Sequence, residues 1–253
     1  MDKMERRPKI TLFVDTVSPF AYEAYWIFRN DPTFSRCDIE YVPVFLGGIM
    51  KDVGGIPPIN IKNKDKWINQ ERLRWASLFN IPISKTTPVG FPHSTLKIQR
   101  ALCVLPFLFP EKKAEQEVLC KLLDNFYQLY WAEGKDITVA GVLEGILRDV
   151  IGEEKAGIVL REIPGKGKEA IGRNNGRAIQ EGAFGLPWMV CTNSSGKTEG
   201  FWGSVESFAI NSFNYILSYH LPSCVLKYLR NSSPPWVIFS PIQSANPHPL
   251  FRD

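Results

Sequence analysis

Strand-like segments occur in two groups, one near each end of this 253-residue chain, and their separation constrains the fold most. Residues 9–15 (KITLFVD) form a short apolar run typical of a strand buried on both faces. Residues 37–46 (CDIEYVPVFL) alternate well enough to be a second strand. Strand patterns return only at 186–193 and 198–203, joined by a turn-rich connection of hairpin length. We therefore expect one sheet whose halves come from distant parts of the chain.

Helical patterns follow the first strand and occupy most of the chain between the two groups of strands. Ser18-Pro19 opens a helix through Arg29, so the chain starts as a β-α-β unit with a parallel strand pair. The amphipathic stretches that follow are 64–79, 94–109 and 111–134, with Gly134, Gly152 and Pro164-Gly165 separating further helices. A last helix is expected from Ser204 to about residue 220.

The resulting class is α/β: a thioredoxin-like mixed sheet (β-α-β … β-β-α) interrupted by a large all-helical insertion. The sequence predicts a thioredoxin-like domain from residues 1–60 and 183–221, and an inserted helical domain at 61–182. A Pro-rich C-terminal tail follows at 222–253. An insertion of this size is tolerable because the cost of closing a loop grows only logarithmically with its length.

Composition excludes several classes of protein. Hydrophobic residues make up 44% of the chain and charged residues 22%, which predicts a folded core. A net charge of +4 is too mild to indicate nucleic-acid binding. Apolar stretches such as 101–109, interrupted by Pro106, are too short to span a membrane, and the charged N-terminus lacks a secretory signal pattern. We expect a soluble, cytoplasmic protein, with mitochondria or peroxisomes left open.

Cysteine and histidine spacing argues against metal and disulfide chemistry. The five cysteines are widely spaced, odd in number and never form a CxxC pair. The three histidines, His93, His220 and His248, are dispersed without ligand spacing. The sequence therefore predicts no metal site and a reducing compartment.

The first candidate site is the junction at residues 15–20 (DTVSPF). Ser18 is placed to cap the following helix with Pro19 at its first position, which leaves free amides at the positive end of the helix dipole. An anion, including a thiolate, is stabilised there. The alternative is that Ser18 is only a helix cap.

Three more segments are candidates. Leu186-Pro187 follows a glycine-rich turn, where a thioredoxin-like order has a cis-proline loop, and the residue before it would offer its backbone to an extended ligand. Ser204, at a strand-to-helix turn, would cap the last helix and could receive a carboxylate. The Gly/Pro-rich passage 45–58 reads equally as a flexible linker or as a wall over the Ser18 helix terminus.

These motifs together resemble one family. DTVSPFAY, PVFLGGIMKDVGGIPP, PVGFPHSTLKIQRAL, GAFGLP and FWGS occur in the order and spacing of kappa-class glutathione transferases and the related 2-hydroxychromene-2-carboxylate isomerases. The resemblance covers about residues 9 to 220, and members of this family resemble the disulfide oxidoreductase DsbA in fold. In thioredoxins the place of Ser18-Pro19-Phe20-Ala21 is held by a redox CxxC, so dithiol–disulfide cycling is excluded there.

The resemblance implies glutathione as cofactor. Ser18 would be catalytic, holding the glutathione sulfur as a thiolate beside Pro19 and Phe20. The backbone of Leu186, before Pro187, would bind the cysteinyl segment, and Ser204 the γ-glutamyl carboxylate.

Two departures from the family pattern weaken the expected binding. Val205-Glu206 stands where the family usually reads Asp-Arg, and Gly55 stands where it usually has asparagine. Glu206 would either replace the missing acid from one residue later or repel the ligand carboxylate. One lost charge-assisted hydrogen bond, worth roughly 1.5–3 kcal/mol, would weaken binding about tenfold to a hundredfold.

Three functions follow as hypotheses. The first is a kappa-type transferase whose thiolate attacks a small-molecule electrophile; the second is a glutathione-dependent isomerase using the same residues. The third is a non-catalytic protein that binds a ligand or partner. Aromatic residues near the motifs are candidates for an apolar second-substrate pocket: Phe20, Trp67, Trp188 and Trp202. The resemblance also implies a homodimer.

Overall fold

The computed structural model describes residues 6–202. The predicted last helix and the Pro-rich tail lie outside the described residues, as do the predicted binding residues Ser204, Val205 and Glu206. The boundaries predicted for the domains remain predictions.

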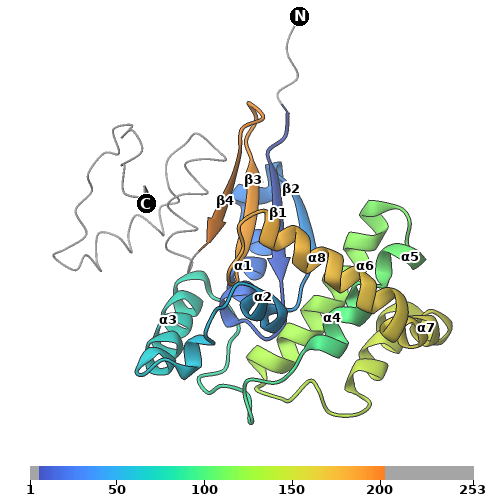
Figure 1. The fold of residues 1–253 in the computed structure, drawn as a ribbon, viewed down its shortest axis with the longest axis horizontal. Coiled ribbons are helices and arrows are strands. Elements are labelled where there is room, and N and C mark those ends of the chain that lie inside the picture. Colours follow the sequence, from blue (N-terminus) through green and yellow to red (C-terminus); the bar gives the residue numbers. More distant parts are fainter. Residues whose placement is uncertain (1–5, 203–253) are drawn as a thin grey trace, which may run out of the picture. The chain divides into compact units, whose positions relative to one another are not determined.

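A four-stranded mixed sheet forms the centre of the described structure (Figure 1). Its strands are β1 (Lys9–Val14), β2 (Asp38–Pro43), β3 (Trp188–Thr192) and β4 (Thr198–Trp202), in the spatial order β2-β1-β3-β4. β1 pairs with β2 in parallel and with β3 antiparallel, while β3 and β4 form an antiparallel hairpin. The predicted α/β class and the joining of both strand groups in one sheet are confirmed.

Helices cover both faces of this sheet. On one face lies α1 (Pro19–Asn30), whose Tyr25 ring meets the Tyr41 ring of β2 edge to face at 4.9 Å. On the other face lies α8 (Lys168–Gln180), which crosses the strands in Figure 1 and places Ala178 in one core cluster with Phe13 and Trp188. Successive residues of a strand point to opposite faces, so β1 packs against both layers.

The helices between β2 and β3 follow the predicted pattern with local breaks. They are α2 (Leu46–Asp52), α3 (Lys64–Phe79), α4 (Leu96–Leu102), α5 (Leu105–Leu108), α6 (Lys112–Tyr127), α7 (Val142–Glu162) and α8, with π-helical turns at Gln128–Ala132 and Ile163–Gly167. Short 3-10 turns occupy Pro32–Arg36 and Pro58–Asn60. The stretch predicted as one helix at 94–109 is two helices, and Pro106 is the second residue of α5, where a missing N–H costs little. Gly152 interrupts α7 with φ 80° and ψ 162°.

The Gly/Pro-rich passage after β2 contains a helix, so its reading as a flexible linker is wrong for residues 46–52. Ile49 of α2 is fully buried in the core cluster that also contains Ala21 and Leu186. Gly54, with φ 70°, ends the helix: its N–H donates to the carbonyl of Lys51, and the N–H of Gly55 to that of Met50. This is a Schellman arrangement, which requires a left-handed residue and favours glycine. The predicted wall is therefore a capped helix packed on the core.

Side-chain amides close the outer edge of β2. Gln116 of α6 accepts from the Tyr41 N–H at 2.8 Å and donates to its carbonyl at 3.1 Å. Asn174 of α8 donates to the carbonyl of Pro43 at 2.8 Å. Asn175 accepts from the Phe45 N–H at 2.9 Å and donates to its carbonyl at 3.1 Å. Alternate residues of one strand edge thus bond to helical side chains where another strand would otherwise pair.

Within residues 6–202 no helix is both long and apolar enough to cross a membrane. In the same region no group of three His, Cys, Asp or Glu side chains is arranged to hold a metal ion.

Candidate functional site

Ser18 caps α1 at the end of a tight turn that leaves β1. Its N–H donates to the Asp15 carbonyl at 3.1 Å, and its Oγ accepts from the Ala21 N–H at 3.2 Å. Pro19 is the first helical residue, where the missing N–H removes one donor that would need a partner. The Ser18 side chain is almost fully buried, with 4% of the residue exposed. The predicted cap is confirmed.

Capping leaves two donors available at this helix terminus. A hydroxyl can accept hydrogen bonds while donating its own hydrogen, so the bond from Ala21 leaves the Ser18 O–H to donate. The Phe20 N–H, at the second helical position, has no partner among the described residues. Both donors lie at the positive end of the α1 dipole. The arrangement favours an anion.

Asp15 belongs to the segment 15–20 that the sequence predicts as the first candidate site, but sequence reasoning assigned it no role of its own. Its carboxylate is fully buried and accepts from Thr95 Oγ1 at 2.6 Å, Gln99 Nε2 at 3.1 Å and the Val17 N–H at 3.2 Å, all through Oδ1. Oδ2 accepts from the Leu46 N–H, the first residue of α2, at 2.8 Å. Burial raises its pKa to about 6, against the lowering effect of these hydrogen bonds. The signal in the sequence was a lone acid directly after an apolar strand.

The Leu186-Pro187 segment lies beside α1. Its peptide bond is cis, as predicted. Leu186 shares a buried core cluster with Ala21 of α1 and Ile49 of α2, which brings three candidate segments together. Over residues 6–202 neither the N–H nor the C=O of Leu186 has a hydrogen-bond partner. Both groups remain available to pair with an extended chain.

The remaining predicted site residues differ in how far they are exposed to solvent. Gly55 is exposed in the cap of α2, which gives it a structural role independent of any ligand. Phe20 is partly buried at the α1 terminus, and Trp67 is 45% exposed on α3. Trp188 is buried, while Trp202 is 47% exposed and packs on Phe184 with ring centroids 4.8 Å apart. Their roles toward a second substrate remain predictions.

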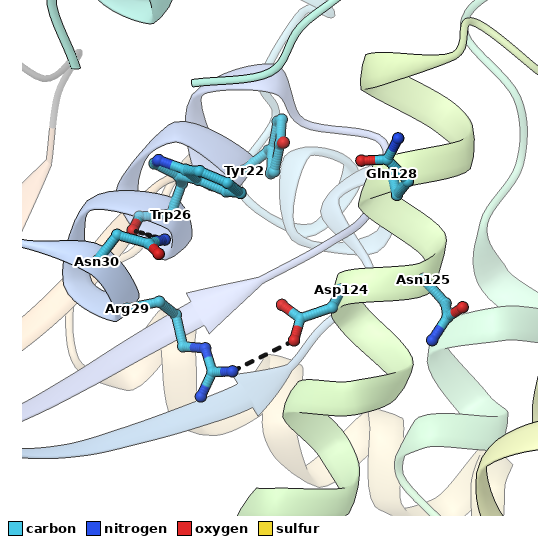
Figure 2. A pocket seen from close by; sticks show the side chains of 7 residues that line it. All are labelled: Tyr22, Trp26, Arg29, Asn30, Asp124, Asn125 and Gln128. Atoms are coloured by element: carbon cyan, nitrogen blue, oxygen red, sulfur yellow. Dashed lines mark hydrogen bonds and ion pairs between the residues drawn. The ribbon is translucent and has the colours of Figure 1, made fainter. Parts of the chain in front are cut away.

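A separate surface pocket of about 420 Å³ lies between α1 and α6 (Figure 2). The rings of Tyr22 and Trp26 line it together with an Arg29–Asp124 ion pair of 3.2 Å. Ser18, Phe20 and Leu186 are not among its lining residues. This pocket is distinct from the Ser18 site.

A cis-proline loop beside the N-terminus of the first helix, on a β2-β1-β3-β4 sheet with inserted helices, agrees with a sequence comparison that matches residues 9–213 to the DSBA-like thioredoxin domain. The chain belongs to this family.

Two curated relatives and one solved structure are similar to most of this chain. Glutathione S-transferase kappa 1 of Rattus norvegicus is 27% identical over 197 residues, covering 77% of this chain and 85% of the relative. The 2-hydroxychromene-2-carboxylate isomerase of Sphingobium xenophagum is 26% identical over 198 residues, covering 77% and 92%. A solved structure of a 2-hydroxychromene-2-carboxylate isomerase matches with a TM-score of 0.64 at 18% identity, over 81% of this chain and 93% of that chain. The resemblance predicted from the motifs is confirmed.

Proposed function

We propose that this protein is a glutathione-dependent enzyme of kappa-transferase type, with Ser18 as its catalytic residue. The observation that carries the proposal is the set of donors at the α1 terminus that have no partner among residues 6–202: the Phe20 N–H and the hydrogen of the Ser18 hydroxyl. A thiolate fits this environment, because both donors and the helix dipole favour a negative charge. The kappa-class relatives support glutathione as its source.

The chain's own residues would have separate tasks. Ser18 donates to the sulfur, and the Phe20 N–H, next to Pro19, adds a second donor. Leu186, before Pro187, pairs its backbone with the cysteinyl segment, and Ser204 receives the γ-glutamyl carboxylate. Bound glutathione supplies a nucleophilic sulfur that forms a carbon–sulfur bond with a small electrophile, while the leaving group departs with its electron pair.

The departures at Gly55, Val205 and Glu206 set the expected strength of binding. Gly55 supplies no side-chain amide, and Val205 supplies no carboxylate for the γ-glutamyl ammonium. We expect glutathione to bind about tenfold to a hundredfold more weakly than a site with one more charge-assisted hydrogen bond.

A second candidate is a glutathione-dependent isomerase, favoured by the similarity to 2-hydroxychromene-2-carboxylate isomerase. The thiolate would add to a conjugated enone, and after bond rotation the same carbon–sulfur bond would break. Both candidates use the same residues.

A third candidate, a non-catalytic binding protein, is favoured by the departures at Val205 and Glu206. We also propose a homodimer and a cytoplasmic location.

Calorimetric titration with glutathione tests the proposal, with the native chain and Ser18→Ala compared. The variant should bind at least about tenfold more weakly, since a hydrogen bond to a charged group is lost. It should also lose about 1 kcal/mol of unfolding free energy as a lost helix cap.

Asp31→Ala is the matched control, because Asp31 caps the next turn by accepting from the Thr33 N–H at 2.9 Å. It should lose stability without losing affinity. An aryl-halide conjugation assay then tests the two enzymes: tight binding without conjugation favours the isomerase or a transferase with a narrow natural substrate. No saturable binding to the native chain contradicts both enzymes.

A further inference from the structure

The Asp15 carboxylate joins three elements that are distant in sequence. Its Oδ1 accepts from Gln99 of α4 and from Thr95, the residue just before α4. Oδ1 also accepts from the Val17 N–H in the Ser18 turn, and Oδ2 accepts from the Leu46 N–H at the start of α2. The Asp15 carbonyl also accepts from the Ser18 N–H. One residue thus bonds the Ser18 turn, α2 and α4 at the same point.

Among residues 6–202, every hydrogen-bond partner of the carboxylate is a donor. An ionised carboxylate is an acceptor only and accommodates about four donors, so the ionised form satisfies all of its partners. A protonated carboxyl must donate one hydrogen. Three donors converge on Oδ1, whereas only the Leu46 N–H converges on Oδ2. Protonating Oδ2 disturbs one hydrogen bond, whereas protonating Oδ1 would disturb three. The proton therefore goes to Oδ2, and the hydrogen bond from the Leu46 N–H of α2 weakens.

In the part of the chain that the structure describes, the ionisable groups that face Asp15 from the packed elements carry no charge near neutral pH. They are Tyr127 of α6 and Tyr130 of the following π-helical turn, and burial raises the pKa of both phenols. Tyr130 in turn contacts His93 Nδ1 through its hydroxyl at 3.1 Å. Among the described residues, the donors that hold the Asp15 charge are therefore neutral.

We propose that Asp15 is the positioning residue of the Ser18 site: its ionised carboxylate clamps α2 and α4 to the Ser18 turn, and protonation releases the α2 side of the clamp. The expected effect on glutathione affinity rests on the proposed function, whereas the expected effect on the protection of α2 does not. Because α2 shares the buried cluster of Ala21 and Leu186, releasing it disturbs the wall beside the α1 terminus.

The test measures two quantities in the full chain between pH 5 and pH 8. The first is the hydrogen-exchange protection of amides in residues 46–52, corrected for intrinsic exchange rates; the second is glutathione affinity by calorimetry. In the native chain, protection should fall as the pH drops through about 6, because release of α2 removes the Leu46 bond that lowers the Asp15 pKa while Thr95 and Gln99 keep the carboxyl buried. In Asp15→Asn, protection should be low at every pH, since an amide N–H₂ would face the Leu46 N–H, and affinity should be at least about tenfold weaker at pH 8.

Two further variants keep the proposal falsifiable. Thr95→Val removes the strongest bond that lowers the Asp15 pKa, so the midpoint of the protection change should move to higher pH while Oδ2 keeps its partner. Asp31→Asn is the control, a capping carboxylate at the other end of α1, and should leave the protection of 46–52 native. Protection of α2 that does not vary with pH, or an unmoved midpoint in Thr95→Val, would overturn the clamp. If glutathione fails to bind the native chain, the proposed function fails, and the exchange data still decide the clamp.

Discussion

At the scale of single residues, the Ser18 site shows how one hydroxyl can have two roles. Ser18 Oγ accepts from the Ala21 N–H, and its own hydrogen remains to donate. The interpretations of Ser18 as a cap and as a ligand-binding residue are therefore compatible. The local pattern Ser-Pro after an apolar strand was enough to predict this.

Asp15 could not be predicted in the same way. Its partners Leu46, Thr95 and Gln99 are 31, 80 and 84 positions away in the chain. Hydrogen bonds between residues so far apart produce no periodic pattern in a single sequence, so the sequence alone does not indicate them.

Glu23 of α1 is a second acid that is fully buried. Neither of its carboxyl oxygens has a hydrogen-bond partner among the described residues. Burial raises its pKa well above the ordinary value; Arg72 opposes this shift and Glu71 adds to it. The folded protein therefore keeps a proton on Glu23 at a pH where the unfolded chain releases it.

This difference predicts how stability depends on pH. Stability from Glu23 is fully present below about pH 4.5 and is lost as the pH rises toward the folded-state pKa, at up to about 1.4 kcal/mol per pH unit. Glu23→Gln removes this titration, so its unfolding free energy should depend less on pH than that of the native chain. Urea unfolding at several pH values measures this. The exposed Glu117→Gln serves as control and should keep the native slope; an equal slope in Glu23→Gln would contradict the argument.

At the scale of elements, the segments with a clear periodicity were predicted well and α2 was not. The helix at Lys64–Phe79 agrees with its predicted bounds. Residues 46–52 contain two glycines, and the N-cap residue Phe45 has no side-chain group that could cap the helix. Tertiary contacts stabilise it instead: Ile49 enters the core, Asp15 accepts from the Leu46 N–H, and Asn175 accepts from the Phe45 N–H. Such contacts override a weak intrinsic propensity.

The edge of β2 yields a prediction about an element. Gln116 satisfies both backbone groups of Tyr41, and leaving a partly buried N–H and C=O without partners costs about 1–3 kcal/mol. Gln116→Leu should therefore lower the unfolding free energy by about this amount in urea titrations. Gln128→Leu is the control, because the exposed side chain of Gln128 donates to the side chain of Glu133 at the surface, and this variant should change stability by less than about 0.5 kcal/mol. Equal losses in the two variants would show that the edge bonds contribute nothing specific.

At the scale of the whole molecule, the order of strand patterns was enough to predict the mixed sheet and its helical insertion. It did not predict how closely the inserted helices would bond to the sheet layer. The Trp131 indole donates to the Thr16 carbonyl at 2.9 Å, and the Tyr25 hydroxyl donates to Asp124 at 2.6 Å. With the Asp15 contacts, these bonds cross between the parts predicted as separate domains.

Such bonding predicts that the sheet and the inserted helices unfold together. Far-ultraviolet circular dichroism, dominated by the inserted helices, and a near-ultraviolet signal of the aromatic core should give coincident urea transitions. Trp131→Phe leaves the buried Thr16 carbonyl without its indole donor, so it should lower the unfolding free energy by about 1–3 kcal/mol. Both signals should move together in this variant, because the lost bond joins the two parts. A helical signal that persists after the aromatic signal is lost would instead mean that the insertion folds on its own, and that its bonds to the sheet are too weak to couple the two.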